Sequence, residues 1–331
     1  MLRSETAEDP ARMAAALAGL KAYQQAPRCA ASQPMPEIAR VGRAALRDFG
    51  GTGPFVLFVP SLINPPDVLD LDEDRSLLRW LAGQGVRPLL LDWGTPGPGE
   101  RELTIAGHVE TMLLPLLDAI GEPVHLAGYC LGGTMALAAA ARRPVRSLTT
   151  IAAPWRFACY PPEMRTELSL LWDSAAPGAE ALGLLPMEVL QAAFWRIDPA
   201  RTIAKYEAFG RRDPDDPSAR RFVRLEDWAN DGPPLTLAAA KELFFDLYQA
   251  DRSGKGDWHV AGAPVDPADV KAPILEIVST TDRIVPAAAT PGQSKPLSIA
   301  LGHVGMIVGS RARTQLWEPL AAWLSQVRTS W

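Results

Sequence analysis

The sequence predicts an α/β fold, in which a mostly parallel sheet is flanked by helices and interrupted by an inserted cap. Short apolar runs alternate with helix-like stretches from about residue 54 to residue 154. This alternation is typical of a parallel sheet that is covered on both faces. It stops over 155–265 and resumes with an apolar run over 272–280. We therefore expect the last part of the sheet to follow a long insertion.

The first elements are predicted from apolar runs and helix signals. Residues 10–28 are rich in alanine at helical spacing, which predicts a helix. Pro54 and Pro60 enclose a continuous apolar run, as expected of a buried parallel strand. The stretch 72–85 begins with acidic residues and ends with glycines, which are the start and stop signals of a helix.

The same signals predict strands and helices in the rest of the chain. The further predicted elements are strands over 87–94, 123–128, 147–154 and 272–280, helices over 104–120, 131–143 and 313–327, and a hairpin around 256–267. We therefore expect an N-terminal helical extension over 1–50, an α/β core over 51–154 and 266–331, and a cap over 155–265.

Composition excludes some classes of function. The net charge of -5 argues against a nucleic-acid partner. Cys29, Cys130 and Cys159 form neither a disulfide framework nor a close metal-ligand spacing, so we expect reduced thiols and no metal or prosthetic group. No apolar run approaches the roughly 18 residues of a membrane span, and the N-terminus lacks an apolar leader. A cytoplasmic location is the expectation.

The strongest motif is Gly128-Tyr129-Cys130-Leu131-Gly132, which fits the nucleophile elbow Gly-x-Nuc-x-Gly of the α/β-hydrolase fold. It follows a predicted strand and opens a predicted helix, as such an elbow requires. Gly128 and Gly132 let strand and helix approach each other, and the helix N-terminus favours a thiolate. The Leu131 N–H is left free to bind an oxyanion. We expect Cys130 to be a catalytic nucleophile rather than a buried structural thiol.

The order nucleophile, acid, histidine in this fold selects the partners of Cys130. His303 lies in a glycine-flanked loop before the last predicted helix, where the base belongs. The other histidines fit other roles: His108 a structural one, His125 a place in the core with a backbone partner, and His259 a surface position or a substrate contact. Asp282 directly follows the strand over 272–280 and is the expected acid.

Two other acids are candidates for the role given to Asp282. The second oxyanion donor is predicted from its position in the sequence alone. Glu276 lies in the middle of a predicted strand, and Asp257 lies in the cap, so both are weaker candidates. The loop after the first buried strand should supply the second donor, and we expect the backbone N–H of Leu62 to fill this role. Cys159 is expected to pack without a catalytic role.

With these residues in place, the chain resembles the polyhydroxyalkanoate synthases, most closely the short two-subunit type. The resemblance spans about residues 55–327 and is carried by VPSLINPP, LLLDWGTP, GYCLGGT, the block ADVKAPILEIVSTTDRIVP and GHVGMIVG. It implies transfer of 3-hydroxyacyl groups from CoA thioesters through an acyl-enzyme on Cys130, with His303 and Asp282 completing the site. It also implies a homodimer, an accessory subunit and association with a polymer-granule surface. The segment 287–302 looks too short for the helix and strand that the family usually has there.

The GYCLGG box alone leaves a second function open, because dienelactone hydrolases carry much the same box. A cysteine-dependent esterase, thioesterase or lactone hydrolase on the same fold is therefore the alternative. A scaffolding relative without activity is a third hypothesis, against which the Cys130, Asp282 and His303 set argues.

Overall fold

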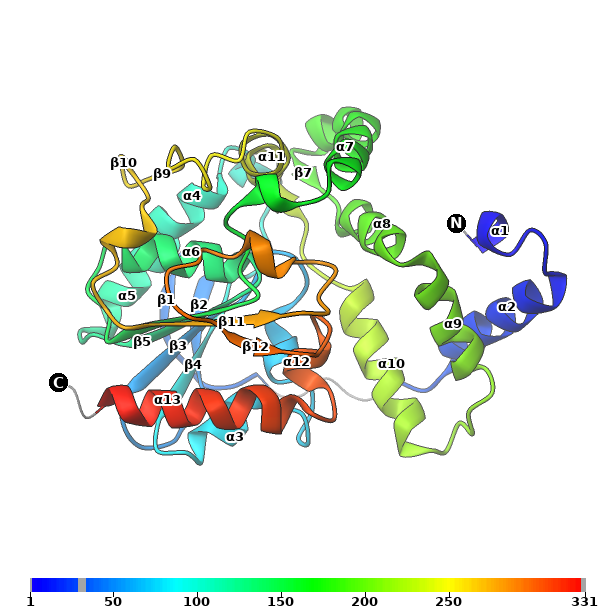
Figure 1. Cartoon of the computed structure of the whole chain (residues 1–331), viewed down its shortest axis with the longest axis horizontal. Helices are drawn as coiled ribbons and strands as arrows, with labels where there is room; N and C mark the ends of the chain where they lie inside the picture. Colours follow the sequence, from blue (N-terminus) through cyan, green and yellow to red (C-terminus); the bar gives the residue numbers. More distant parts are fainter. Residues whose placement is uncertain (1, 29–33, 329–331) are drawn as a thin grey trace.

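The structure, a computed structural model, describes residues 2–28 and 34–328. Cys29 lies outside these residues. The eight-stranded sheet has the order β1-β2-β4-β3-β5-β6-β11-β12. From β4 to β12 all neighbours are parallel, whereas β1, β2 and β4 pair antiparallel. The α/β-hydrolase fold, predicted as a mostly parallel sheet between helices, is confirmed, and Figure 1 shows the helices on both faces.

The strands of this sheet are β1 Glu37–Val41, β2 Ala44–Asp48, β3 Phe55–Val59, β4 Arg87–Asp92, β5 His125–Tyr129, β6 Ser147–Ile151, β11 Ile274–Ser279 and β12 Leu297–Ile299. The helices of the core are α3 Leu77–Ala82, α4 Ile105–His108, α5 Leu114–Ile120, α6 Leu131–Ala140, α12 Gly305–Val308 and α13 Glu318–Arg328. Segments of π-helix, Val109–Leu113 and Arg313–Trp317, join α4 to α5 and lead into α13.

The sheet separates two apolar clusters, because successive side chains of a strand point to opposite faces. In β3, Leu57 and Val59 belong to the cluster that includes α4, α5 and α6, whereas Val56 and Phe58 belong to the cluster under α3 and α13. This two-sided burial explains why the sequence of β3 is continuously apolar.

Residues 37–48 differ from the prediction of a helical extension over 1–50. They form the hairpin of β1 and β2, which joins the sheet through antiparallel pairing of β2 with β4. Ala44, Ala45 and Leu46 are fully buried there. Burial against the sheet outweighs the low intrinsic preference of alanine for strands. The helical prediction is wrong for this segment.

The inserted segment between β6 and β11 is mainly helical. Its helices are α7 Pro162–Leu182, α8 Met187–Ile197, α9 Pro199–Phe209, α10 Pro217–Asn230 and α11 Leu237–Lys241, followed by the π-helical segment Glu242–Gln249. Short strand pairs are formed by β7 Leu184–Leu185 with β8 Leu235–Thr236, and by β9 His259–Val260 with β10 Ala263–Pro264. The latter pair confirms the predicted hairpin.

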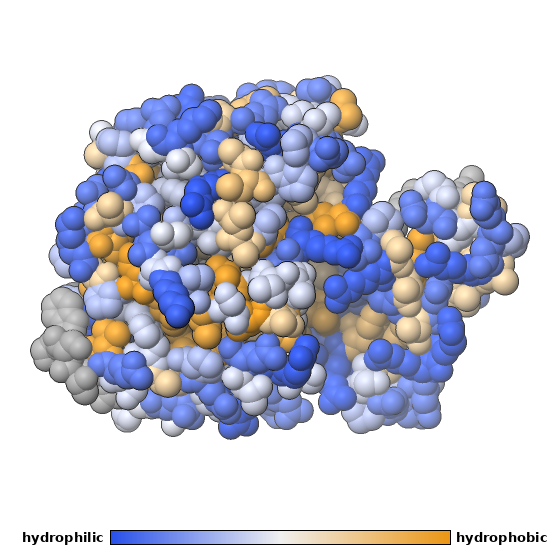
Figure 2. All heavy atoms as spheres, viewed as in Figure 1, coloured by the Kyte–Doolittle hydropathy of each residue, from blue (hydrophilic) through white to orange (hydrophobic). Residues whose placement is uncertain are grey.

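The N-terminal helices α1 Leu2–Glu5 and α2 Pro10–Gln25 pack on α9 rather than on the sheet. Tyr23, Tyr206 and Phe209 belong to a small apolar cluster of their own, and Arg12 pairs with Glu207 at 2.7 Å. In Figure 1 this arm stands to the right of the sheet, and Figure 2 shows it separated from the main body by a hollow on this face.

The segment 287–302 keeps its strand as β12, while a single 3₁₀ turn, Ala287–Ala289, stands in place of a helix. Within the described part of the chain, no helix is both long and apolar enough to cross a membrane.

Candidate active site

Cys130 occupies the turn between β5 and α6. Its backbone has φ 55° and ψ -132°, a strained conformation that non-glycine residues rarely adopt. The Cys130 N–H donates to the carbonyl of Ile151 at 2.9 Å, which ties the turn to the neighbouring strand. The thiol is partly exposed and lines a cavity of about 230 Å³.

Glycines on both sides of Cys130 make this turn sterically feasible. A Cβ at Gly128 would lie 2.4 Å from the Cα of Gly133, and a Cβ at Gly132 would lie 2.1 Å from the carbonyl oxygen of Val59. A Cβ at Gly133 would lie 2.4 Å from the Cβ of Ala153. The elbow therefore depends on the close approach of α6 to β3 and β5, as the spacing of the motif predicts.

His303 and Asp282 lie side by side at the same edge of the sheet. The His303 Nδ1 is 2.6 Å from Oδ2 of Asp282. The other carboxylate oxygen accepts N–H bonds from Ile284 at 2.7 Å and Val285 at 3.1 Å. The Asp282 side chain is fully buried, and that of His303 is 8% exposed. Because Nδ1 is occupied by Asp282, Nε2 is the ring nitrogen left for Cys130.

The electrostatics of His303 favour its charged form. Burial lowers the pKa of His303, but Cys130 and Asp282, through their charges and hydrogen bonds, outweigh burial and raise this pKa to about 10. The structure thus brings Cys130, His303 and Asp282 together, with His303 between the other two. This is the order of nucleophile, histidine and acid in a catalytic triad.

Tyr129 fixes the ring of His303 from one side. The two ring centroids are 5.0 Å apart with an interplanar angle of 28°, and the Tyr129 hydroxyl donates to the His303 carbonyl at 3.2 Å. The residue inside the elbow motif therefore also positions the histidine.

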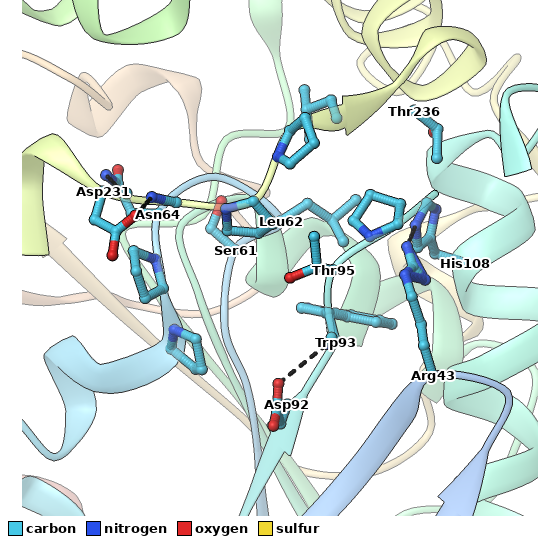
Figure 3. Close-up of a pocket in the computed structure, with 18 residues that line it drawn as sticks. Arg43, Ser61, Leu62, Asn64, Asp92, Trp93, Thr95, His108, Asp231 and Thr236 are labelled. Carbon is cyan, nitrogen blue, oxygen red and sulfur yellow. Dashed lines mark hydrogen bonds between the residues drawn. The ribbon is translucent and has the colours of Figure 1, made fainter. Parts of the chain in front are cut away.

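The two expected oxyanion donors lie in different elements, one at the start of a helix and the other in a loop. Leu131 is the first residue of α6, where the N–H groups of a helix lack intrahelical partners. Leu62 lies in the loop after β3 between Ser61 and Ile63, which both line the Cys130 cavity. The Leu62 side chain itself lines a neighbouring cavity (Figure 3).

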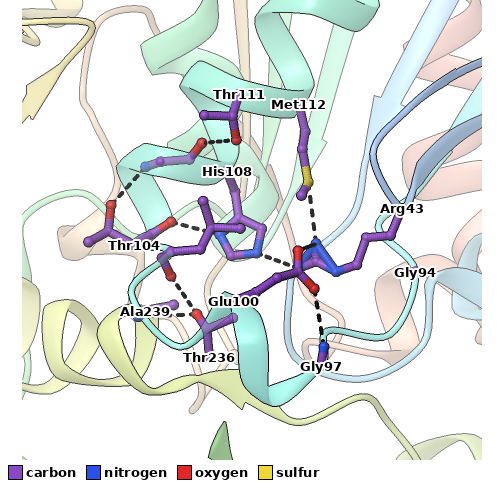
Figure 4. Close-up of polar contacts among 12 residues, drawn as sticks. Arg43, Gly94, Gly97, Glu100, Thr104, His108, Thr111, Met112, Thr236 and Ala239 are labelled. Atoms are coloured by element: carbon purple, nitrogen blue, oxygen red, sulfur yellow. Dashed lines mark hydrogen bonds and ion pairs between the residues drawn. The ribbon is translucent and has the colours of Figure 1, made fainter. Parts of the chain in front are cut away.

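That neighbouring cavity, of about 310 Å³, is lined by a polar pair, the half-buried Arg43 and the buried His108 (Figures 3 and 4). Arg43 Nη2 donates to Nε2 of His108 at 2.6 Å, and His108 Nδ1 faces the Thr104 carbonyl at 2.7 Å. Burial is the main cause that lowers the pKa of His108 to about 4. His108 is therefore neutral and supports the hairpin that carries Arg43, in line with the structural role predicted for it.

The remaining candidates are not among the described residues that line the Cys130 cavity. His125 is buried with its Nδ1 2.7 Å from the hydroxyl oxygen of Ser147, and His259 is exposed on β9. Glu276 is buried, and its carboxylate accepts the N–H groups of residues 292–294, so it holds that turn. Asp257 is exposed. The expectation that Cys159 packs is wrong, because Cys159 is exposed in a 3₁₀ turn, Phe157–Cys159.

Two polar residues at the site were not predicted. Tyr160 and Tyr248 line the Cys130 cavity, and the charge of Cys130 acts on both hydroxyls. They lie in the inserted segment, far from the elbow in sequence and without a motif around them. Among the described residues, no group of three or more His, Cys, Asp or Glu side chains is placed to hold a metal ion.

Comparison with known proteins agrees with this geometry. The family model of the alpha/beta hydrolase fold matches residues 54–298, so the fold and elbow define a member of that superfamily. A solved epoxide hydrolase from Vigna radiata superposes with a TM-score of 0.55 at 14% identity, covering 90% of this chain and all of that one, and supports the fold alone.

Similarity to curated proteins narrows the family. The chain is 30% identical to the poly(3-hydroxyalkanoate) polymerase subunit PhaC of Haloferax mediterranei over 82% of its own length, and spans 58% of that relative. It is 29% identical to the same subunit of Allochromatium vinosum, covering 82% of this chain and 80% of the relative. The chain belongs to the polyhydroxyalkanoate synthase family of the α/β-hydrolase superfamily.

Proposed function

We propose that this chain is a cysteine-dependent acyltransferase of the polyhydroxyalkanoate synthase type, which takes 3-hydroxyacyl groups from CoA thioesters onto Cys130. One observation carries the proposal: the elbow cysteine lies beside His303, whose Nδ1 is held by the buried carboxylate of Asp282 at 2.6 Å. Such an arrangement suits a thiolate nucleophile with a proton carrier next to it.

In the first half-reaction, the Cys130 thiolate attacks the thioester carbonyl. The N–H groups of Leu131 and Leu62 bind the oxygen as it becomes negative. The carbon–sulfur bond to CoA then breaks, and the leaving sulfur takes the proton from His303. The products are acyl-Cys130 and CoA with a free thiol, and the neutral His303 is ready to act as a base.

In the second half-reaction, His303 removes the proton from a hydroxyl group as that oxygen attacks acyl-Cys130. An ester forms, the bond to Cys130 breaks, and the thiolate and the imidazolium are restored. When the attacking hydroxyl belongs to another hydroxyacyl group, the chain grows. When it belongs to water, the result is the hydrolase alternative. The proposed chemistry requires no metal or prosthetic group, and CoA enters only as part of the substrate.

The test is intact-mass detection of an acyl adduct after mixing the protein with 3-hydroxybutyryl-CoA, together with CoA release. We expect an adduct on the wild type and on Cys159→Ala, the matched cysteine control, which removes an exposed thiol outside the cavity. Cys130→Ala should show neither adduct nor turnover. The family resemblance implies a homodimer and an accessory subunit at a granule surface, so the assay is run with and without a candidate subunit.

The products separate the two functions. Polymer or an oligomeric ester supports the proposal, and free 3-hydroxybutyrate as the sole product would assign the chain to the hydrolases. An absence of adduct and of CoA release under both conditions, or full activity of Cys130→Ala, would overturn the thiol mechanism.

A further inference from the structure

Most polar side chains around the Cys130 cavity are already occupied by the protein. Asn64 donates to backbone carbonyls of residues 229 and 231, and Gln191 contacts Asn230. Thr202 donates to the Asp198 carbonyl, and Lys205 pairs with Glu226 at 2.7 Å. Each of these side chains therefore already has a partner within the protein.

Tyr160 and Tyr248 differ from these groups. Their ring centroids lie 5.1 Å apart at an interplanar angle of 68°, and Phe157 packs against both rings. The two hydroxyls are within reach of each other, but among the described residues the buried Tyr160 hydroxyl has no partner of good hydrogen-bond geometry. A buried hydroxyl without a well-formed hydrogen bond is costly, and in native proteins such groups call for an explanation.

The position of Tyr248 indicates that these hydroxyls serve substrate binding. Tyr248 lines both the Cys130 cavity and an outer cavity of about 430 Å³ that runs between α7, α8 and the loop at Ile284. Leu168, Phe194 and Ile284 border both cavities as well, so the surroundings of the hydroxyl pair are largely apolar. An acyl group on Cys130 that extends toward the outer cavity passes Tyr248.

Both tyrosines are neutral in this setting. Burial is the main cause that raises the pKa of Tyr160 and of Tyr248 well above that of an ordinary phenol, and the charge of Cys130 raises both further. Each therefore keeps a proton to donate, and each oxygen can also accept. This dual capacity matches an alcohol, which is itself both donor and acceptor.

We propose that the Tyr248 hydroxyl binds the 3-hydroxyl group of the acyl chain on Cys130, and that the neighbouring Tyr160 hydroxyl positions the Tyr248 hydroxyl. Tyr248 thereby selects 3-hydroxyacyl over unsubstituted acyl groups. This inference rests on the proposed acyl transfer to Cys130. It adds the residue that recognises the 3-hydroxyl group of the substrate. A site that hydrogen-bonds a substrate hydroxyl discriminates against the analogue that lacks it, because the buried polar group of the site is then left unpaired.

The test measures single-turnover acylation of Cys130 by 3-hydroxybutyryl-CoA and by butyryl-CoA, which lacks the hydroxyl. For Tyr248→Phe we expect kcat/KM for 3-hydroxybutyryl-CoA to fall about tenfold, the size of one lost hydrogen bond, with butyryl-CoA changed less than about twofold. Tyr160→Phe should shift the same ratio in the same direction by a smaller factor. Tyr23→Phe, which also removes a phenol hydroxyl but lies in the N-terminal arm, should leave the ratio unchanged.

The outcomes separate this inference from the function on which it rests. An equal loss with both substrates would reduce Tyr248 to a packing residue, and an unchanged ratio in Tyr248→Phe and in Tyr160→Phe would remove both hydroxyls from recognition. Either result overturns the inference while leaving acyl transfer intact. Failure of the wild type to be acylated by either thioester would instead overturn the proposed function.

Discussion

Asp282 holds His303 through Oδ2 while its Oδ1 accepts two backbone N–H groups from the turn that follows it. The carboxylate is therefore fixed at both oxygens and cannot turn away from the imidazole without losing three hydrogen bonds. Its orientation keeps the proton on Nδ1 and leaves Nε2 for the sulfur of Cys130.

Asp282→Asn should lower the acyl-transfer rate by about 10²–10⁴-fold while retaining the fold, because an amide can present its NH₂ group to Nδ1 and favour the wrong tautomer. Single-turnover CoA release measures the effect. Asp257→Asn, an exposed acid in the inserted segment, is the matched control and should retain the wild-type rate. Equal rates for the two variants would contradict the role given to Asp282.

The raised pKa of His303, about 10, predicts that its imidazolium persists through neutral pH. The ring resonances of His303, followed by NMR between pH 6 and pH 8, should therefore stay nearly unchanged. A midpoint near 6.5 for this ring would contradict the raised pKa.

Cys130→Ala supplies the comparison, because Cys130 is one of the two groups that raise the pKa of His303. The His303 midpoint should be lower in this variant, and an unchanged midpoint would show that Cys130 does not act on the ring.

Gly132→Ala should destabilise the protein by about 3 kcal/mol or more, or abolish soluble expression. The added Cβ would lie 2.1 Å from the carbonyl oxygen of Val59, and both partners are backbone of the sheet and of α6, which cannot move apart cheaply. Urea unfolding measures the change. Gly178→Ala, in α7 with no atom within 4 Å of the new Cβ, should instead stabilise by about 0.5–1 kcal/mol.

His108 should make folding stability sensitive to mild acid. Its folded-state pKa of about 4 lies below the unfolded value of 6.5, so the unfolded chain binds more protons as the pH falls between these values. His108 alone should remove roughly 3 kcal/mol of stability from about pH 6.5 to pH 4. The urea-derived stability of His108→Gln should fall less steeply over this range, whereas exposed His259→Gln should match the wild type.

The sequence predicts the strand–helix alternation well, because β3, β5 and the elbow have local signals: an apolar run, a glycine pair and a helix opening. It does not predict the β1–β2 hairpin. The segment Ala44 to Asp48 has neither β-branched residues nor clear alternation, and its strand state depends on pairing with β4, a partner more than forty positions later. Non-local pairing of this kind leaves little trace in a local pattern.

The candidate site likewise contains residues that the sequence predicts and residues that it does not. Cys130, His303 and Asp282 follow from the motif and from chain order, and the structure places them in contact. Glu276 could be set aside for its mid-strand position, and its binding to the 292–294 turn accounts for its burial. Tyr160 and Tyr248 have no such signal, because their place beside Cys130 arises only when the inserted segment folds over the elbow.

The close backbone contacts of the elbow occur at Gly128, Gly132 and Gly133, and they do not involve the side chain of residue 130. The backbone strain at that position is the same whether sulfur or oxygen follows the β-carbon. The scaffold and the reactive atom are therefore sterically separable. An exchange of thiol for alcohol at residue 130 adds no atom to the crowded turn, whereas a Cβ at any of the three glycines would collide with atoms of a neighbouring segment.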